Sequence, residues 1–104
     1  MTAVARALRA KKVEVEPEYV LRLFVSGFTP RSLRAIDNLR TICDGHLAGR
    51  YRMEVVDLYQ SPSLAHDEQI IATPTLLKIR PTPQRRVIGD LSDVGKVLHG
   101  LDIR

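Results

Sequence analysis

The sequence predicts a single α/β domain in which strands and helices follow the order βαβαββα. Its 104 residues are enough for one hydrophobic core, and 44% apolar with 27% charged residues is ordinary for a soluble globular domain. Apolar runs of strand type alternate with segments of helical spacing. The first half has the pattern strand, helix, strand, which favours a parallel strand pair joined by a right-handed crossover.

The first strand is expected over "EYVLRLFV", where only Arg22 interrupts a run of aromatic and branched apolar residues. Such a run is typical of a strand buried on both faces. From Pro30 onward the apolar residues recur at helical spacing, so a helix should follow. Thr29 is the expected N-cap with proline in the first turn, and the helix should end at Gly45 or Gly49.

The second half supplies the remaining elements. "YRMEVVDLY" alternates like a strand, "SPSLAHDEQ" is a short turn or helix, "TPTLLKI" is a third strand, and "RRVIGD" returns as its antiparallel partner. Ser92 can cap a last helix over "DVGKVLHGLDI", with Val94, Val97, Leu98 and Leu101 on one side. The complete order is thioredoxin-like.

Two features of this half weaken or constrain the prediction. Gly95 and Gly100 each cost about 1 kcal/mol relative to alanine inside a helix, and the valines of the segment favour strands, so either secondary structure could form at this end. Pro74 directly precedes a buried strand, where the ladder needs a donor. A cis Thr73–Pro74 bond at a tight turn is therefore expected.

The net charge of +4 is concentrated at the N-terminus. Four of the sixteen basic residues lie in the first twelve positions, which hold no acidic residue, so the rest of the chain has twelve of each sign. Residues 1–16 are expected to be a mobile basic leader and residues 17–104 the domain. No specific nucleic-acid partner and no membrane association are expected. The lack of a secretory signal and the single cysteine favour a cytoplasmic protein.

No catalytic constellation is recognisable. The loop "SGFTPRS", where a thioredoxin-like enzyme would carry Cys-x-x-Cys, has no sulfur, and Gly27 predicts that it serves as a tight turn. Cys43 falls near a helix C-terminus on the apolar side, which favours a buried structural thiol. His46, His66 and His99 are scattered without metal-ligand spacing. We therefore expect no catalytic residue, no metal and no cofactor.

Three segments together resemble the KaiB family of circadian clock proteins. They are "YVLRLFVSGFTPRSLRAIDNLRTIC", "YRMEVVDLYQSPSLAHDEQIIATPTLLKIRP" and "RRVIGDLSDVGKVLHGLD", which cover Tyr19 to about Asp102. The succession of "TPRSLRAI", "ATPTL" and "IGDLSD" is the specific part of the resemblance. It implies a non-enzymatic binding protein that associates with the hexameric ATPase ring of KaiC, and with KaiA where that partner exists.

The resemblance also implies two folded states. One is the thioredoxin-like βαβαββα monomer that binds the ring, and the other is a βαββααβ fold that forms dimers and tetramers. The weak helical code at the C-terminal end agrees with two packings of similar free energy. Pro74, Gly100 and Asp102 are the suspected fold-switch positions.

Residue-by-residue matching to the family's pattern suggests Arg34, Tyr51, Lys78 and Arg85 for the partner surface. The alternative for each is a solvated position, and for Tyr51 a partly buried strand end. The chain departs from the family's pattern in its basic leader, in stopping at Arg104, and in Glu54 and Gln69, which stand where clock members commonly have lysines.

Two functional hypotheses follow. The first is a KaiB-type binding module in a clock or stress-timing system, whose partner is a KaiC-like ATPase. The second is a thiol-dependent redox protein or sensor that uses Cys43, against which the missing Cys-x-x-Cys argues. A variant of the first, a module similar to the N-terminal domain of the SasA kinase, is less favoured because no kinase follows within the 104 residues.

Overall fold

A computed structural model describes residues 17–103, and the expected leader (1–16) and residue 104 lie outside the described residues. The order of elements is βαβαββα, as predicted. The elements are β1 (Tyr19–Val25), α2 (Pro30–His46), β2 (Tyr51–Asp57), α3 (Ser63–Asp67), β3 (Thr75–Arg80), β4 (Arg85–Ile88) and α4 (Val94–Gly100).

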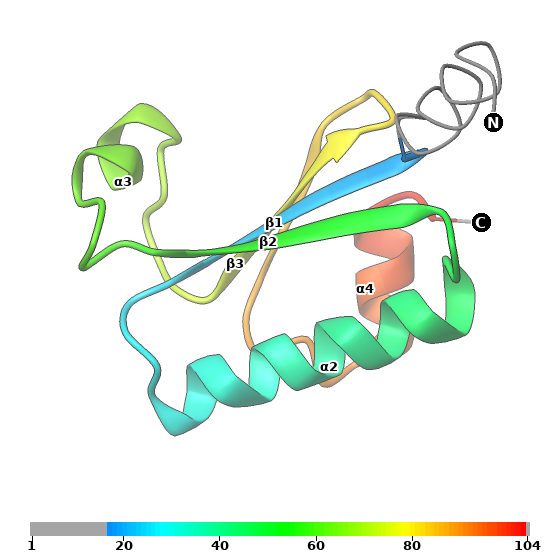
Figure 1. Cartoon of the computed structure of the whole chain (residues 1–104), viewed down its shortest axis with the longest axis horizontal. Coiled ribbons are helices and arrows are strands. Elements are labelled where there is room, and N and C mark those ends of the chain that lie inside the picture. The colour runs from blue at the N-terminus through cyan, green and yellow to red at the C-terminus, as the bar shows by residue number, and fades with distance from the viewer. Residues whose placement is uncertain (1–16, 104) are drawn as a thin grey trace, which may run out of the picture.

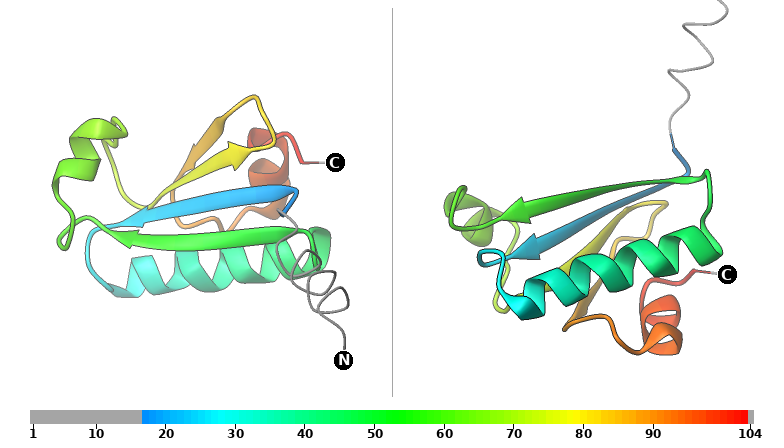
Figure 2. Two further views of the ribbon diagram at one scale, coloured as in Figure 1. Left: turned by 45° about the horizontal axis from the view of Figure 1, so that its top comes forward. Right: turned by 60° about the horizontal axis from the view of Figure 1, so that its bottom comes forward.

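The four strands form one mixed sheet in the order β2-β1-β3-β4. β1 and β2 are parallel, as the strand–helix–strand pattern predicts, whereas β3 pairs antiparallel with both β1 and β4. Both α2 and α4 lie against one face of the sheet, and α3 stands beyond the end at which β1 and β2 finish (Figures 1 and 2). One face of the sheet is therefore covered by two helices, and the other is covered only in part.

The core lies on both sides of β1, which is buried along its length except at the half-buried Arg22. Side chains of a strand alternate between faces, so Leu21, Leu23 and Val25 point toward α2 and join the main core cluster there. Phe24 points the other way and forms a smaller cluster with Leu58 and Leu77 under α3. The prediction of a strand buried on both faces is confirmed.

The start of α2 also follows the local code. Thr29 is the N-cap, its Oγ1 accepts a hydrogen bond from the Ser32 N–H at 3.2 Å, and Pro30 opens the first turn. The helix runs through Gly45 to His46, and Gly49 then turns the chain with φ of +73°. The end of the helix thus falls between the two predicted glycines.

The last helix differs from its prediction at both ends. Asp93, not Ser92, is the N-cap, and its Oδ1 accepts from the Lys96 N–H at 3.1 Å. Ser92 lies one residue before the cap, and its N–H donates to Asp90 Oδ1 at 3.1 Å. The helix spans only Val94–Gly100, and Val94 is 43% exposed rather than part of the apolar side. The expected cis Thr73–Pro74 bond is confirmed.

Candidate partner-binding surface

The loop between β1 and α2 is a turn that is fixed by hydrogen bonds and contains no cysteine. Gly27 has φ of +75°, and its N–H donates to Asp57 Oδ1 at 3.0 Å. The positive φ favours glycine, and a Cβ at this position would lie 3.0 Å from the exposed Tyr59 ring, which would have to move slightly. The Thr73 hydroxyl donates to Ser26 Oγ at 3.0 Å and connects the loop to the segment before β3. The loop therefore has the structural role predicted for it.

An apolar groove lies beside this loop. It has a volume of about 330 Å³, and its lining includes Leu58, Tyr59, Ala65 and Ile71. Tyr59 and Ile71 are largely exposed. Large apolar side chains exposed next to one another are typical of a contact surface.

Cys43 has the opposite environment from a reactive thiol. Its side chain is fully buried in α2 among the main core cluster. Burial, and secondarily the charge of Asp44, raise the pKa of the thiol from 9.0 to about 12. Since the thiolate is the nucleophile, a thiol that stays protonated in the fold disfavours the redox hypothesis.

The four suspected partner residues do not form one cluster. Tyr51 begins β2 at one edge of the sheet, where it is half-buried and its hydroxyl bonds to Asp44 Oδ1 at 2.7 Å. That hydrogen bond is the main reason why the pKa of Tyr51 is raised. Arg34 lies on the exposed side of α2. Lys78 and Arg85 are the pair that the structure brings together, directly opposite each other on β3 and β4.

Lys78 is not at a solvated position, so that alternative is wrong for this residue. It is 1% exposed, because the alternation of β3 turns it toward the helix-covered face together with Leu76. No hydrogen bond or ion pair joins it to another of the described residues. No side-chain nitrogen or oxygen of the described residues is both fully buried and unpaired, so the aliphatic stem of Lys78 is buried while its ammonium reaches solvent.

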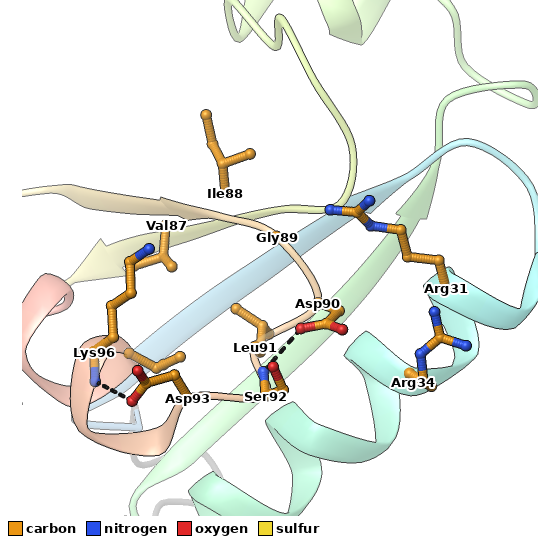
Figure 3. Close-up of a pocket in the computed structure, with 11 residues that line it drawn as sticks. Arg31, Arg34, Val87, Ile88, Gly89, Asp90, Leu91, Ser92, Asp93 and Lys96 are labelled. Atoms are coloured by element: carbon orange, nitrogen blue, oxygen red, sulfur yellow. Dashed lines mark hydrogen bonds between the residues drawn. The ribbon is translucent and has the colours of Figure 1, made fainter.

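A basic cleft that the sequence did not predict lies between α2 and the β4–α4 connection (Figure 3). Its volume is about 280 Å³, and its cations are Arg31 and Arg34 from α2 and Lys96 from α4. Arginines three residues apart share one side of a helix, and this was the available signal. Lys96 joins them only because the chain folds back after β4.

Two aspartates line the same cleft, and the carboxylate of each accepts a hydrogen bond from a backbone N–H group. Asp93 caps α4, and Asp90 accepts from Ser92. The pKa of Asp90 is lowered, first by its hydrogen bonds with Ser92 and then, at longer range, by Arg34 and Arg31. Asn38 Nδ2 donates to the Asp90 carbonyl at 2.8 Å and fixes the connection against α2. These hydrogen bonds fix the shape of the cleft, and its three cations outnumber its two aspartates.

The suspected fold-switch residues lie at two places. The Pro74 carbonyl accepts from Gly89 N–H at 2.9 Å at the start of the β3–β4 pair. Gly100 ends α4 so close to β4 that an added Cβ would lie 2.8 Å from Val87 Cγ2. Asp102 follows with φ of +56°, a left-handed conformation that aspartate tolerates better than most residues. Gly100 and Asp102 thus occupy positions with specific steric demands.

Glu54, which stands where clock members of the family commonly have a lysine, forms local ion pairs on the less covered face of the sheet. Glu54 forms ion pairs with Arg22 at 3.2 Å and with Arg52 at 3.7 Å, and Arg22 also approaches Glu68 at 3.9 Å. The Arg86 guanidinium donates to the backbone carbonyls at the end of α3, those of Glu68 and Gln69. In this chain the glutamate belongs to an internal charge network.

Within residues 17–103, no group of His, Cys, Asp and Glu side chains could hold a metal ion. His66 and Asp67, which the sequence places together, are exposed, and their side chains lie 3.7 Å apart. Among the described helices, none has the length and apolar character needed to cross a bilayer.

Comparison with known proteins gives a consistent match. The family model described as the KaiB domain matches residues 22–103. A protein named circadian clock oscillator protein KaiB from Prochlorococcus marinus is 53% identical over 85 residues, covering 82% of this chain and 79% of the relative. A protein of the same name from Nostoc punctiforme is 47% identical over 91 residues, covering 88% of each.

Solved structures give the same fold at lower sequence identity. The N-terminal domain of SasA from Synechococcus elongatus superimposes with a TM-score of 0.69 at 24% identity, covering 85% of this chain and 87% of that domain. Mitochondrial thioredoxin 3 from Saccharomyces cerevisiae superimposes with a TM-score of 0.65 at 13% identity, covering 92% and 88%. These likenesses establish the thioredoxin-like fold.

Proposed function

This chain belongs to the KaiB family, and from that premise we propose that it is a non-enzymatic regulatory protein of the cytoplasm that binds a KaiC-type ATPase ring. The observation that carries the proposal is the identity of about 50% with clock proteins named KaiB over more than four fifths of the chain. The ring would belong to a clock or a related stress-timing system, and KaiA would be a further partner only where the organism has it.

Three properties of the described residues support a binding role. The element order is βαβαββα, the arrangement that the family resemblance associates with the ring-binding monomer. The loop at the usual site of thioredoxin chemistry has no cysteine, and the single thiol is buried with a pKa of about 12. An apolar groove and a basic cleft are both open to a macromolecular partner.

Arg34, Tyr51, Lys78 and Arg85 remain our candidates for the ring contact, at three separate places. Lys78 and Arg85 form one part on the helix-covered side of β3 and β4. Arg34 belongs to the basic cleft, whereas Tyr51 lies at the opposite edge of the sheet. A large ring surface is the kind of partner that could reach positions so far apart.

We also propose that the chain can adopt the βαββααβ state and assemble into dimers or tetramers. The support is local: α4 has seven residues, two of them glycine, and Asp102 beyond it is left-handed. Pro74, Gly100 and Asp102 are the residues we assign to the switch. Assembly stabilises the second state by mass action, so the monomer should be favoured at low concentration.

The proposal is tested by mixing the protein with the KaiC-type ATPase of its own organism and separating the mixture by size exclusion. Co-elution is expected with the wild type, and it should weaken in Arg34→Ala and Arg85→Ala. Arg40→Ala is a matched control, because Arg40 is also exposed on α2 but lies outside the basic cleft. A failure to co-elute at any ring concentration, with and without ATP, would exclude this partner.

A further inference from the structure

One edge of β4 pairs with no strand among the described residues. It is the edge strand of the sheet, and β3 is its neighbour on the other side. Antiparallel pairs alternate between residues that exchange ladder hydrogen bonds and residues that do not. The Gly89 N–H donates to the Pro74 carbonyl at 2.9 Å. By this alternation, the backbone groups of Val87 and Arg85 also form hydrogen bonds with β3. The N–H and C=O groups of Arg86 and Ile88 therefore point to the free edge.

The two sides of this edge differ in chemistry. Ile88 faces the less covered side of the sheet and is 48% exposed. On the other side, Val87 points toward α4, where Lys96 stands over the strand (Figure 3). Residues of an added strand would alternate between these two sides.

The groove beside the edge is continuous and positively charged. The basic cleft and a second cavity of about 350 Å³ share Val87, Ile88 and Lys96 in their linings. The cations along them are Arg31, Arg34 and Lys96, against the two aspartates that accept from backbone N–H groups. Arg86 lines the second cavity, but its guanidinium is bound to the carbonyls of Glu68 and Gln69. None of Arg31, Arg34 and Lys96 forms a salt bridge with another of residues 17–103.

We propose that the β4 edge binds an extended acidic segment of a partner protein by strand addition. The backbone of the segment bonds to Arg86 and Ile88. Its apolar side chains pack on Ile88, and its alternate acidic side chains reach Lys96 and the arginines of the basic cleft. Unpaired edge groups supply affinity in this mode, and the flanking side chains supply specificity.

A second copy of this chain fits the edge poorly. Its own edge strand, "RRVI", carries two arginines and no acidic residue, so a second copy brings no partner for Lys96 or the arginines of the basic cleft. The surface shares Arg34 with the proposed ring contact and lies on the strand that holds Arg85, but its test does not use an ATPase ring. The proposal consequently stands or fails separately from the proposed function.

The test uses a fluorescent eight-residue peptide of alternating Glu and Val, with the matched Lys and Val peptide as charge control. Anisotropy should rise for the Glu peptide only. Lys96→Gln should weaken binding by about fivefold or more, as expected for the loss of one charge-assisted contact. Arg52→Gln, an exposed arginine on the opposite edge strand, is the control for a general loss of positive charge and should leave binding unchanged.

Ile88→Pro separates strand addition from charge attraction. Proline at this edge position removes an outward N–H and no ladder bond, and Ile88→Thr keeps the N–H as a folding control. Strand addition requires loss of binding in Ile88→Pro, and slowed exchange of the Arg86 and Ile88 amides in the wild-type complex. Equal binding of both peptides, full binding by Ile88→Pro, or unchanged amide exchange would each overturn the proposal. Preferential binding to RNA or anionic vesicles would do so too.

Discussion

Replacing Gly100 by alanine should reveal a direct steric coupling between α4 and β4. Alanine favours a helix interior by about 1 kcal/mol over glycine, and the gain is smaller at Gly100, the last residue of α4. The added Cβ, however, would lie 2.8 Å from Val87 Cγ2, and β-branched valine has little rotamer freedom to move away. Overpacking of this kind typically costs about 1–3 kcal/mol. The gain in propensity is thus offset as long as Val87 keeps its methyl groups.

Val87→Ala removes the obstructing methyl, so the two substitutions should be non-additive. Val87 is partly buried against the core, and its truncation alone should cost about 1–2 kcal/mol. In the double mutant the alanine Cβ occupies the vacated space. The free energy of unfolding of the double mutant should therefore exceed the additive expectation by about 1–2 kcal/mol.

The assay is urea unfolding followed by circular dichroism on the four proteins of the cycle, at concentrations where sedimentation gives a monomer. Gly95→Ala is the matched control, because its added Cβ meets its nearest atom, Asp93 Oδ1, at an ordinary 3.7 Å. It should stabilise α4 by about 1 kcal/mol with no dependence on Val87. Additivity of Gly100→Ala and Val87→Ala within about 0.3 kcal/mol would refute the steric reasoning.

Three further outcomes are expected. Native protein should not react with a disulfide reagent at pH 8. The pKa of Cys43 rises from 9.0 in the unfolded chain to about 12 in the fold, so its contribution to the free energy of unfolding is full below pH 9 and is lost as the pH rises toward 12. If a Cys43→Ser variant loses the same stability over this pH range, the titration of Cys43 is not the cause of the loss. Asp44→Asn should lower the pKa of Tyr51 in an ultraviolet titration, with Tyr51→Phe identifying the transition, and an unmoved curve would exclude the hydrogen bond as its cause. Gly100→Ala with Asp102→Asn, made in the Val87→Ala background where the alanine has room, should raise the monomer fraction relative to Val87→Ala alone. Alanine favours the helix, and asparagine removes a negative charge from its C-terminal end while tolerating the left-handed backbone at this position. An unchanged sedimentation profile would show that these residues do not set the balance in this chain.

The switch assignment and the coupling experiment depend on different properties of Gly100. The coupling is a property of the thioredoxin-like state alone, since it comes from the approach of α4 to Val87. The population shift depends on both states and on protein concentration. A positive result in the first experiment with none in the second would keep the packing and reject the switch.

The local sequence by itself determined the elements whose signals are short-range. Thr29 and Pro30 fix the start of α2 because a cap and a proline act within one turn. The apolar run of β1 specifies a strand buried on both faces because nothing polar except Arg22 has to be accommodated. The absence of a thiol in "SGFTPRS" was sufficient to disfavour redox chemistry at that loop.

Other features were decided only by tertiary structure. Lys78 can be solvated as far as the sequence shows, but the packing of the sheet turns it toward the helix-covered face, where it is buried. Ser92 and Asp93 are both good caps by residue type, and the start of the helix at Val94 gives the role to Asp93. Lys78 is buried by packing between segments far apart in the sequence, whereas the choice between two adjacent cap residues depends on where the chain enters the helix. Residue type encodes neither outcome.

The candidate surfaces show the same division. Arg31 and Arg34 are visible as neighbours on a helix, yet Lys96 joins them only when the chain returns after β4, more than sixty residues along the sequence. Likewise, alternation along "RRVI" predicts a strand but not that its Arg86 and Ile88 backbone groups face solvent. The sequence determined which segments are strands and helices, because capping and periodicity are local. Which edge stays open, and which charges gather beside it, was decided by the packing of the whole sheet.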